Sequence, residues 1–339
     1  MPGDPPTGTA EDLDASAPHG EPRSTGRGTT ASLRPTGAAC WIHSNIHSNE
    51  CQPWEHRAVD GVSLEVAEGE FVGILGPNGA GKTTFLETTE GLRRPDAGTV
   101  TVLGMPVWPR NAAMLPRIGV QLQASSFFER LTAREQLHTF AALHGVGARP
   151  ADEWMARVGL EDKAESRVED LSGGQAQRLS IACALVHDPD VVFLDEPTAA
   201  LDPQARRNLW DLLSGLNDSG RTVVLTTHYM DEAEVLCDRV AIMDKGKILQ
   251  FDSPAALIRG LDAPARITVS PGQLSLDEAL ALSGVDDATE GAEGTVLTTR
   301  QPAGVVSQLA DADHLDGVRV HTGTLEDVFL DLTGREYRA

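Results

Sequence analysis

The stretch "FVGILGPNGAGKTTFLETTEGL", residues 71 to 92, decides the fold. It starts as a short apolar β-run and takes on a helical pattern from Lys82 onward. Between these two elements, GPNGAGKT matches the phosphate-binding loop G-x-x-x-x-G-K-[ST] at every fixed position. The glycines let backbone N–H groups surround phosphates, the lysine adds a positive charge at the terminal phosphates, and the Thr83 hydroxyl can reach Mg²⁺. A glycine-rich turn without this chemistry would need neither Lys82 nor Thr83, so the stretch predicts a nucleotide site. Its residues are Gly76, Pro77, Asn78, Gly79, Ala80, Gly81, Lys82, Thr83 and Thr84.

A second buried strand, "VVFLDEP" at residues 191 to 197, ends in two acids. A carboxylate at the position of Asp195 can hold the Mg²⁺ shell beside a phosphate-binding loop. The next carboxylate, Glu196, is placed to orient or deprotonate a water molecule. Two acids at the end of a strand can also be ordinary solvated residues, but the loop upstream favours the catalytic interpretation.

Two further residues carry weaker signals. His228 closes the β-run "TVVLTTH", and Gln123 lies in "RIGVQLQAS". A single histidine at a strand end usually has no catalytic role. Gln121 competes with Gln123 because it lies two residues away on the same strand alternation. The residues alone therefore leave the roles of His228 and Gln123 open.

The stretch "LSGGQAQRL", residues 171 to 179, opens a helix with two glycines, each of which costs about 1 kcal/mol relative to alanine. Ser172 and Gln175 have the spacing of a capping box, which an ordinary helix start explains. A capping box does not explain why glycine occupies positions 173 and 174. A helix end stripped of side chains offers free N–H groups and a positive dipole to a phosphate. Both interpretations stay open from this stretch alone.

Composition divides the chain into three parts. Residues 1–52 are rich in Pro, Gly, Ser and Thr and are expected to be a disordered extension. Residues 53–261 alternate β-runs with helical patterns and are expected to form an α/β domain with a mainly parallel sheet, with a helical insert at about 124–175. Residues 262–339 are expected to form a small α+β appendage.

Charge and hydropathy exclude several classes of protein. The formal net charge of −22 argues against nucleic-acid binding, which needs a basic surface. The apolar runs are too short to span a membrane, and residues 1–14 lack the basic and apolar parts of a signal peptide. The four cysteines suggest no disulfide framework. We therefore expect a cytoplasmic protein that reaches a membrane only through a partner.

The order of the motifs identifies a family. The phosphate-binding loop, Gln123, LSGGQ, VVFLDEP, "AALD" (residues 199–202) and His228 follow one another along the chain. This set strongly resembles the nucleotide-binding subunit of ATP-binding-cassette (ABC) transporters over about residues 58–260. The phrases "THYMDEAEVLCDRVAIMDKGKI" and "TLEDVFLDLTG" resemble the branch that exports drugs, antibiotics and polysaccharides through a permease on a separate chain.

The resemblance implies the fold, the cofactors and the roles of residues. The fold is a P-loop NTPase cassette, and two cassettes, expected to be a homodimer, enclose two ATP molecules. Ser172, Gly173, Gly174 and Gln175 then contact the γ-phosphate held by the other cassette, which explains the glycines. Thr83, Gln123 and Asp195 bind Mg²⁺ or its shell, Glu196 is the general base, His228 contacts the γ-phosphate and the attacking water, and Asp202 lines the dimer contact.

The chain departs from the family pattern at residues 40–57, "CWIHSNIHSNECQPWEHR". The family places a strand there, followed by an aromatic residue that stacks on adenine. The segment has no useful β-alternation, so we expect disorder through about residue 50 and a weak or missing first strand. Trp54 is the only aromatic residue near the stacking position. Cys40, His43, His47 and Cys51 could be zinc ligands, but their spacing matches no known zinc motif.

The resemblance favours an ATPase subunit at the cytoplasmic face of the membrane that powers export through a separate permease. The alternative is a cassette ATPase of DNA repair, chromosome maintenance or translation. Those proteins carry coiled-coil arms, zinc modules, basic surfaces or paired cassettes, none of which is evident in this sequence. A cassette that binds ATP without turnover is a third possibility, although every catalytic position is intact. The cargo and the direction of transport are not encoded in these motifs.

Overall fold

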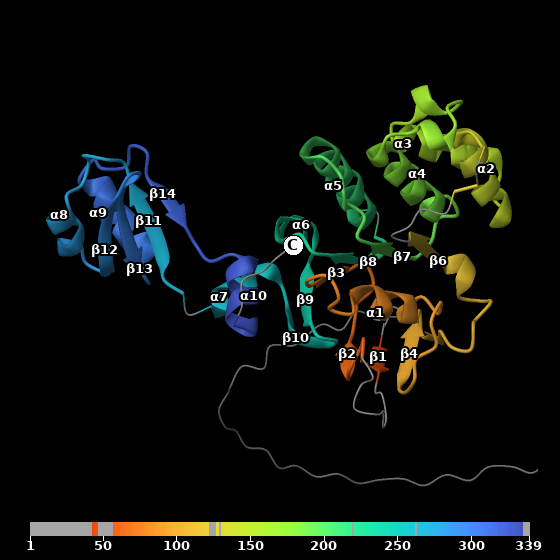
Figure 1. Cartoon of the computed structure of the whole chain (residues 1–339), viewed down its shortest axis with the longest axis horizontal. Helices are drawn as coiled ribbons and strands as arrows, with labels where there is room; N and C mark the ends of the chain where they lie inside the picture. Colours follow the sequence, from red (N-terminus) through yellow and green to blue (C-terminus); the bar gives the residue numbers. More distant parts are fainter. Residues whose placement is uncertain are drawn as a thin grey trace, which may run out of the picture. The chain divides into compact units, whose positions relative to one another are not determined.

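The computed structural model describes residues 43–46, 57–121, 127–128, 130–218, 220–261 and 263–334, with the backbone alone at 43–46 and 217–218. A six-stranded sheet in the order β10-β9-β3-β8-β7-β6 forms the centre of the cassette (Figure 1). Its strands are parallel to their neighbours, except that β10 runs antiparallel to β9. β3, β7 and β8 are buried along their whole length, as their apolar sequences require between two layers of packing. The strands are β3 (Phe71–Leu75), β6 (Ile118–Gln121), β7 (Val191–Asp195), β8 (Thr222–Thr227), β9 (Arg239–Asp244) and β10 (Lys247–Asp252).

A second, antiparallel sheet has the order β2-β1-β4-β5. It consists of β2 (Val62–Leu64), β1 (His43–Ile46), β4 (Thr99–Val102) and β5 (Met105–Pro106). The expectation of disorder through about residue 50 is wrong at β1, which pairs with both β2 and β4. The first strand, expected to be weak or missing, is present with four residues. Backbone hydrogen bonds to two neighbours hold such a strand without alternating apolar residues, which is why the sequence pattern missed it. The remainder of residues 1–52 lies outside the described residues. This includes Cys40, His47 and Cys51, three of the four residues considered as zinc ligands, and only the backbone of the fourth, His43, is described.

The helices cover the central sheet and form the predicted insert. The buried residues of residues 57–261, together with those of the last helix, form two cores, one between the sheet and the helices α4, α5 and α6, and one between the two sheets around α1. The helices of the insert, α2 and α3, pack on α4 (Figure 1). The helices are α1 (Lys82–Thr89), η1 (Leu115–Arg117), α2 (Ala133–Leu143), α3 (Ala148–Arg157), η2 (Glu161–Lys163), η3 (Val168–Asp170), α4 (Gly173–Leu185), α5 (Pro203–Asp218), α6 (Met230–Leu236) and α7 (Pro254–Gly260).

The predicted α+β appendage has its own sheet in the order β12-β13-β11-β14. Its core is formed by buried apolar residues of the sheet and of α9, among them Ile267, Leu297 and Leu309. The elements are β11 (Ala265–Val269), α8 (Leu276–Ala281), β12 (Val285–Gly291), β13 (Gly294–Thr299), α9 (Pro302–Asp311) and β14 (Arg319–His321).

The last helix, α10 (Leu325–Thr333), belongs to the cassette and not to the appendage. Leu325, Val328 and Phe329 are buried in the same core as α5 and α6, and the Leu325 amide donates a hydrogen bond of 3.0 Å to Glu234 Oε1. The predicted boundary at residue 262 therefore misassigns this helix. Its amphipathic pattern shows that one face is buried, but does not show which core buries it.

Phe329→Ala is expected to lower the free energy of unfolding of the cassette by about 3–5 kcal/mol, because the ring is 2% exposed and its loss leaves a cavity. Denaturant unfolding followed by tryptophan fluorescence measures the change. Leu330→Ala, on the exposed face of α10, is the control and should change stability little. Equal effects of the two substitutions would contradict the placement of α10 in the core.

Candidate functional site

The phosphate-binding loop connects the carboxyl end of β3 to the first turn of α1. Its backbone has positive φ at Gly79 (80°) and Gly81 (105°), which favours glycine at both positions. A Cβ at Gly76 would lie 2.2 Å from the Met243 carbonyl oxygen, and one at Gly81 would lie 2.0 Å from the Ala58 carbonyl oxygen. The loop therefore depends on glycine for close packing as well as for dihedral angles. Within the described residues α1 has no side-chain cap hydrogen bond at its N-terminus, which leaves its first amides available to a ligand.

A cleft of about 480 Å³ opens beside this loop. Uncapped helix amides, a buried lysine and glycine backbone meet there, which is the donor set that a polyphosphate requires. The residues present thus fit a nucleoside triphosphate. The cleft is lined by Ala58, Asn78, Gly79, Gly81, Lys82, Thr83, Thr84 and Glu196.

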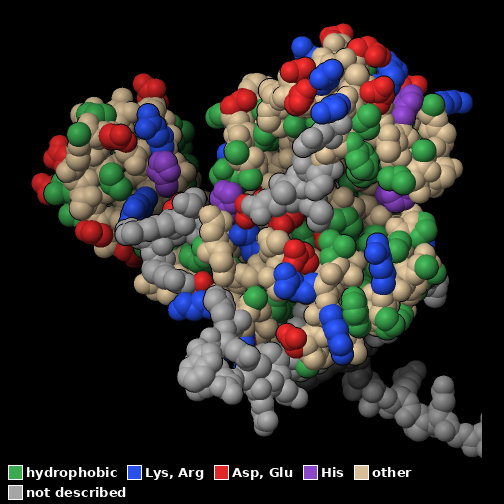
Figure 2. Space-filling view, turned by 45° about the vertical axis from the view of Figure 1, so that its right-hand side comes forward, with side chains coloured by type: hydrophobic (Ala, Val, Ile, Leu, Met, Phe, Trp, Pro, Cys, Tyr) green, Lys and Arg blue, Asp and Glu red, His purple; other side chains and the backbone are tan. Residues whose placement is uncertain are grey.

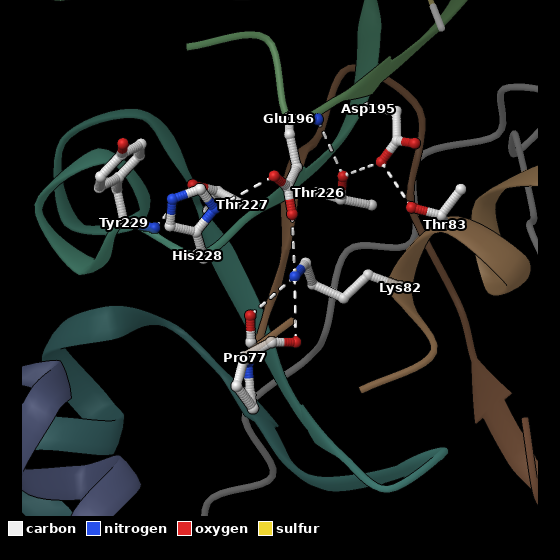
Figure 3. Close-up of polar contacts among 10 residues, drawn as sticks. Pro77, Lys82, Thr83, Asp195, Glu196, Thr226, Thr227, His228 and Tyr229 are labelled. Atoms are coloured by element: carbon white, nitrogen blue, oxygen red, sulfur yellow. Dashed lines mark hydrogen bonds and ion pairs between the residues drawn. The ribbon is translucent and has the colours of Figure 1, made fainter. Parts of the chain in front are cut away.

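Lys82 is buried and held by three oxygen atoms (Figure 3). Its Nζ donates to the carbonyl oxygens of Gly76 at 2.8 Å and Pro77 at 3.3 Å, and it forms an ion pair of 3.0 Å with Glu196 Oε1. A buried ammonium needs such partners because burial without them is costly. A phosphate bound at Lys82 would compete with Glu196 for the same positive charge.

Asp195, at the end of β7, lies next to the threonine of the loop. Its Oδ1 accepts hydrogen bonds from Thr83 Oγ1 at 3.3 Å and from Thr226 Oγ1 (Figure 3). Burial raises the pKa of the Asp195 carboxyl, and the two hydroxyl donors oppose that rise. A hydroxyl and a carboxylate side by side are the hard oxygen ligands that Mg²⁺ prefers, so these residues fit a magnesium ion. Thr226 was missed by the sequence analysis because only the register Asp195↔Thr226 between β7 and β8 brings it there.

Glu196 follows Asp195 with a left-handed backbone, φ 46°, which is uncommon for a residue with a Cβ. Its amide donates to Thr226, to Oγ1 at 3.0 Å and to the carbonyl oxygen at 3.2 Å, which fixes this conformation. The carboxylate then lies between two cationic or protonatable groups. Oε1 pairs with Lys82, and Oε2 lies 3.1 Å from Nδ1 of His228.

His228 extends from the end of β8, beside Tyr229. The two rings have centroids 4.1 Å apart, and the Arg206 guanidinium lies 3.7 Å over the Tyr229 ring. The structure thus brings Lys82, Glu196 and His228 together. Tyr229 and Arg206 carry no sequence signal, because a cation–π contact between α5 and the end of β8 is visible only in the fold.

The predicted capping box at the start of α4 is present. Ser172 Oγ accepts from the Gln175 amide at 3.3 Å, and Gln175 Oε1 accepts from the Ser172 amide at 2.9 Å. The two glycines differ, however. A Cβ at Gly173 would meet no described atom within 4 Å, whereas one at Gly174 would lie 3.3 Å from Ala205 Cβ. Gly174 is thus also kept small by α5 of its own chain, and only Gly173 lies at a fully open position.

The remaining predicted site residues are distributed as follows. Asp202 Oδ1 accepts from the amides of Gln204 and Ala205, both at 3.0 Å, and so caps α5. Among the described residues, no hydrogen bond or ion pair joins Asp202 or the start of α4 to Lys82, Asp195 or Glu196. Gln123 and Trp54 lie outside the described residues.

Comparisons with known proteins agree with this geometry. Residues 59–199 match the family model described as ABC transporter. The chain is 39% identical to the Nod factor export ATP-binding protein I of Paraburkholderia xenovorans (strain LB400), over 83% of this chain and 94% of the relative. It is also 39% identical to the daunorubicin resistance ATP-binding protein DrrA3 of Streptomyces coeruleorubidus, over 84% of this chain and 93% of the relative.

Solved structures show the same fold. The dimeric structure of MJ0796, a bacterial ABC transporter cassette, is 29% identical with a TM-score of 0.56, covering 63% of this chain and 97% of that one. The structure of cbiO1 from Clostridium perfringens, part of an ABC transporter complex, is 26% identical with a TM-score of 0.58. The match covers 66% of this chain and 92% of that one. The P-loop cleft, the acids beyond it and these relatives together show that the chain belongs to the ABC transporter family, as an ATP-hydrolysing subunit of its export branch.

Proposed function

We propose that two copies of this chain hydrolyse ATP at shared sites and that a separate membrane permease uses this hydrolysis to export a cargo. The observation that carries the proposal is the position of Glu196, which has Lys82 on one carboxylate oxygen and His228 on the other, at the edge of the phosphate cleft. This is the arrangement expected for a general base beside a γ-phosphate.

In this proposal each residue of the cleft has one task. The loop amides and Lys82 bind the β- and γ-phosphates and hold them in place. Glu196, released from Lys82 by the phosphate, accepts the proton of the attacking water, and His228 orients the water and the γ-phosphate. Thr83, Asp195 and Gln123 would hold Mg²⁺ or its shell, which would neutralise phosphate charge.

The start of α4 serves the partner's nucleotide in this proposal. The open space at Gly173 supports it, because a phosphate from another molecule can approach there without meeting side chains of the same chain. The neighbour MJ0796 is itself described as dimeric, and one of its structures as bound to ADP and Pi. Asp202 would line the contact between the two cassettes, and a homodimer is the simplest assembly because this chain carries both halves of a site.

The permease is a separate chain in this proposal, which places the cassette at the cytoplasmic face of the membrane. Among the described residues, none of the helices could cross a bilayer. Two relatives at the same level of identity are named for different molecules, Nod factor and daunorubicin. The cassette sequence therefore does not determine the cargo, which we assign to the permease.

Affinity purification tests this function against the alternative class. A tagged chain extracted from membranes in mild detergent should bring with it a protein of several membrane spans, and ATP hydrolysis by the pair should respond to cargo. Recovery with ribosomes or DNA instead would support the non-transport ATPases. The net charge of −22 argues against that outcome.

Trp54→Ala is expected to weaken ATP binding by tenfold or less, which is at most about 1.4 kcal/mol, because the phosphate contacts dominate binding and we place this stacking contact in the lower part of the usual range of about 1–3 kcal/mol. Discrimination between ATP and GTP should already be poor in the unmodified chain. Nucleotide titration with both triphosphates measures these effects. A loss of ATP affinity far above tenfold would contradict a stacking role, and Trp108→Ala, at an exposed tryptophan, is the matched control.

A further inference from the structure

Glu232 is an acidic residue that the fold buries completely. Figure 2 shows acidic side chains at the surface of the molecule, whereas Glu232 is 0% exposed. The other buried acids among the described residues are Glu90, Asp195 and Glu196. Glu232 lies on α6, four residues after His228. Because a carboxyl group removed from water costs stability unless its oxygens are well paired, this residue requires an explanation beyond the packing of α6.

The pairing of the Glu232 carboxyl group is incomplete. Oε1 accepts a hydrogen bond of 3.1 Å from Nε1 of Trp210 on α5, and Oε2 has no aligned hydrogen-bond partner among the described residues. Burial raises the pKa of Glu232, and the nearby hydroxyls of Thr227 and Thr198, the indole and the charge of Arg206 oppose that rise. For stability alone, an uncharged side chain would serve as well at this position.

The groups around Glu232 belong to the two segments that the proposed function uses. Thr227 immediately precedes His228, and its Oγ1 accepts a hydrogen bond of 2.9 Å from the Tyr229 amide, which fixes the backbone on both sides of the histidine (Figure 3). Thr198, which is 1% exposed, lies two residues after the proposed general base. Glu232 therefore lies beside both the segment that presents the histidine and the segment that presents the base.

A second connection to the histidine runs through Arg206 on α5. Its guanidinium lies 3.7 Å over the Tyr229 ring, and that ring lies 4.1 Å from the ring of His228. The Glu232 charge attracts this guanidinium, whereas the ion pair of Arg206 with the exposed Asp231 is long, at 4.0 Å. An exposed pair of this kind contributes little. Without the buried charge, the guanidinium would be held less firmly over the tyrosine.

We propose that Glu232 is a positioning residue for His228: its carboxylate holds Thr227 on one side and Arg206 on the other, so that the imidazole stays against Glu196. The proposal rests on the proposed function, in which the histidine and the general base act on ATP. Glu232 does not line the phosphate cleft. Its effect should therefore appear in the rate of hydrolysis and not in the affinity for ATP.

The test measures kcat and KM of the purified full chain with Mg²⁺ and ATP. Glu232→Gln keeps the size of the side chain and an acceptor for the Trp210 indole but removes the charge. It should lower kcat by about tenfold, because the histidine is misplaced, with KM within about twofold of the unmodified chain. The melting temperature should not fall, because a buried charge is lost while the indole hydrogen bond remains.

Glu234→Gln is the matched control. Glu234 lies on the same helix but at the surface, where its Oε1 accepts a hydrogen bond from the Leu325 amide. The same substitution there removes a charge from α6 without reaching the histidine. It should change kcat by less than about twofold.

A double substitution separates positioning from a general loss of structure. If Glu232 acts through His228, Glu232→Gln should cause no further loss of kcat once His228→Ala is present, whereas an independent structural defect would multiply the two losses. Arg206→Gln tests the same path from α5. It should lower kcat to a similar extent, and combining it with Glu232→Gln should add little.

The outcomes that contradict the proposal are distinct from those that contradict the proposed function. An unchanged kcat in Glu232→Gln, a loss that appears in KM, a lower melting temperature, or a further loss in the His228→Ala background would each overturn the role of Glu232. If His228→Ala alone hydrolyses ATP at the unmodified rate, the proposed role of the histidine itself fails, whatever Glu232→Gln does.

Discussion

Glu196→Gln is expected to lower ATP turnover by at least about 10² while leaving ATP binding intact. Glutamine keeps the size and the hydrogen-bonding oxygen of the side chain but cannot accept the proton of the attacking water. The amide also no longer forms the ion pair that the carboxylate makes with Lys82 at 3.0 Å. Lys82 is then free for phosphate, so ATP affinity should be equal or higher, and a dimer that retains ATP should accumulate.

Phosphate release, nucleotide titration and size-exclusion chromatography with Mg²⁺ and ATP measure these three results. Asp190→Asn is the matched control, because Asp190 lies at the other end of β7 and pairs with Arg117 at the surface. It should change turnover little. Unchanged hydrolysis by purified Glu196→Gln would refute the assignment of the general base, and a parallel loss of ATP binding would show that Glu196 supports the loop instead.

Gly173→Glu is expected to abolish hydrolysis while the variant still binds ATP on its own loop. The Cβ of the new side chain would meet no atom within 4 Å in the part of the chain that the structure describes, so the fold should tolerate it. Its negative charge would lie where the partner's γ-phosphate approaches a positive helix end. Gly174→Asp would be ambiguous, because a Cβ at Gly174 would lie 3.3 Å from Ala205 Cβ and a packing defect could cause the same loss.

A mixing experiment shows whether the loss occurs between molecules. Lys82→Ala disables the loop of one chain, and Gly173→Glu disables the helix end of the other. An equal mixture should recover about a quarter of wild-type hydrolysis, since half of the dimers are mixed and each mixed dimer has one intact site. Hydrolysis by Gly173→Glu alone at the wild-type rate would contradict a shared site, whereas a mixture without activity would show that the two sites do not act independently.

The sequence alone predicts those parts of the site whose residues lie close together along the chain. The loop from Gly76 to Thr83 and the capping box of Ser172 with Gln175 each lie within a few residues, so spacing determines their geometry. The apolar runs of β3, β7 and β8 likewise predicted strands buried on both faces. The order of the motifs then identified the family before any contact was known, and the comparisons confirmed it.

Tertiary structure decided what depends on neighbours distant in sequence. Thr226 reaches Asp195 only through the register of β7 with β8, and β1 exists because two strands pair with it rather than because of its own residues. The amphipathic pattern of α10 predicted a buried face, but only packing showed that the cassette core receives it. The helical pattern at the end of α1 gave no sign that Glu90 is buried without a partner among the described residues. Local spacing fixes backbone geometry within a turn or a strand, whereas strand register and packing decide which distant groups meet, and those contacts have no pattern within one segment.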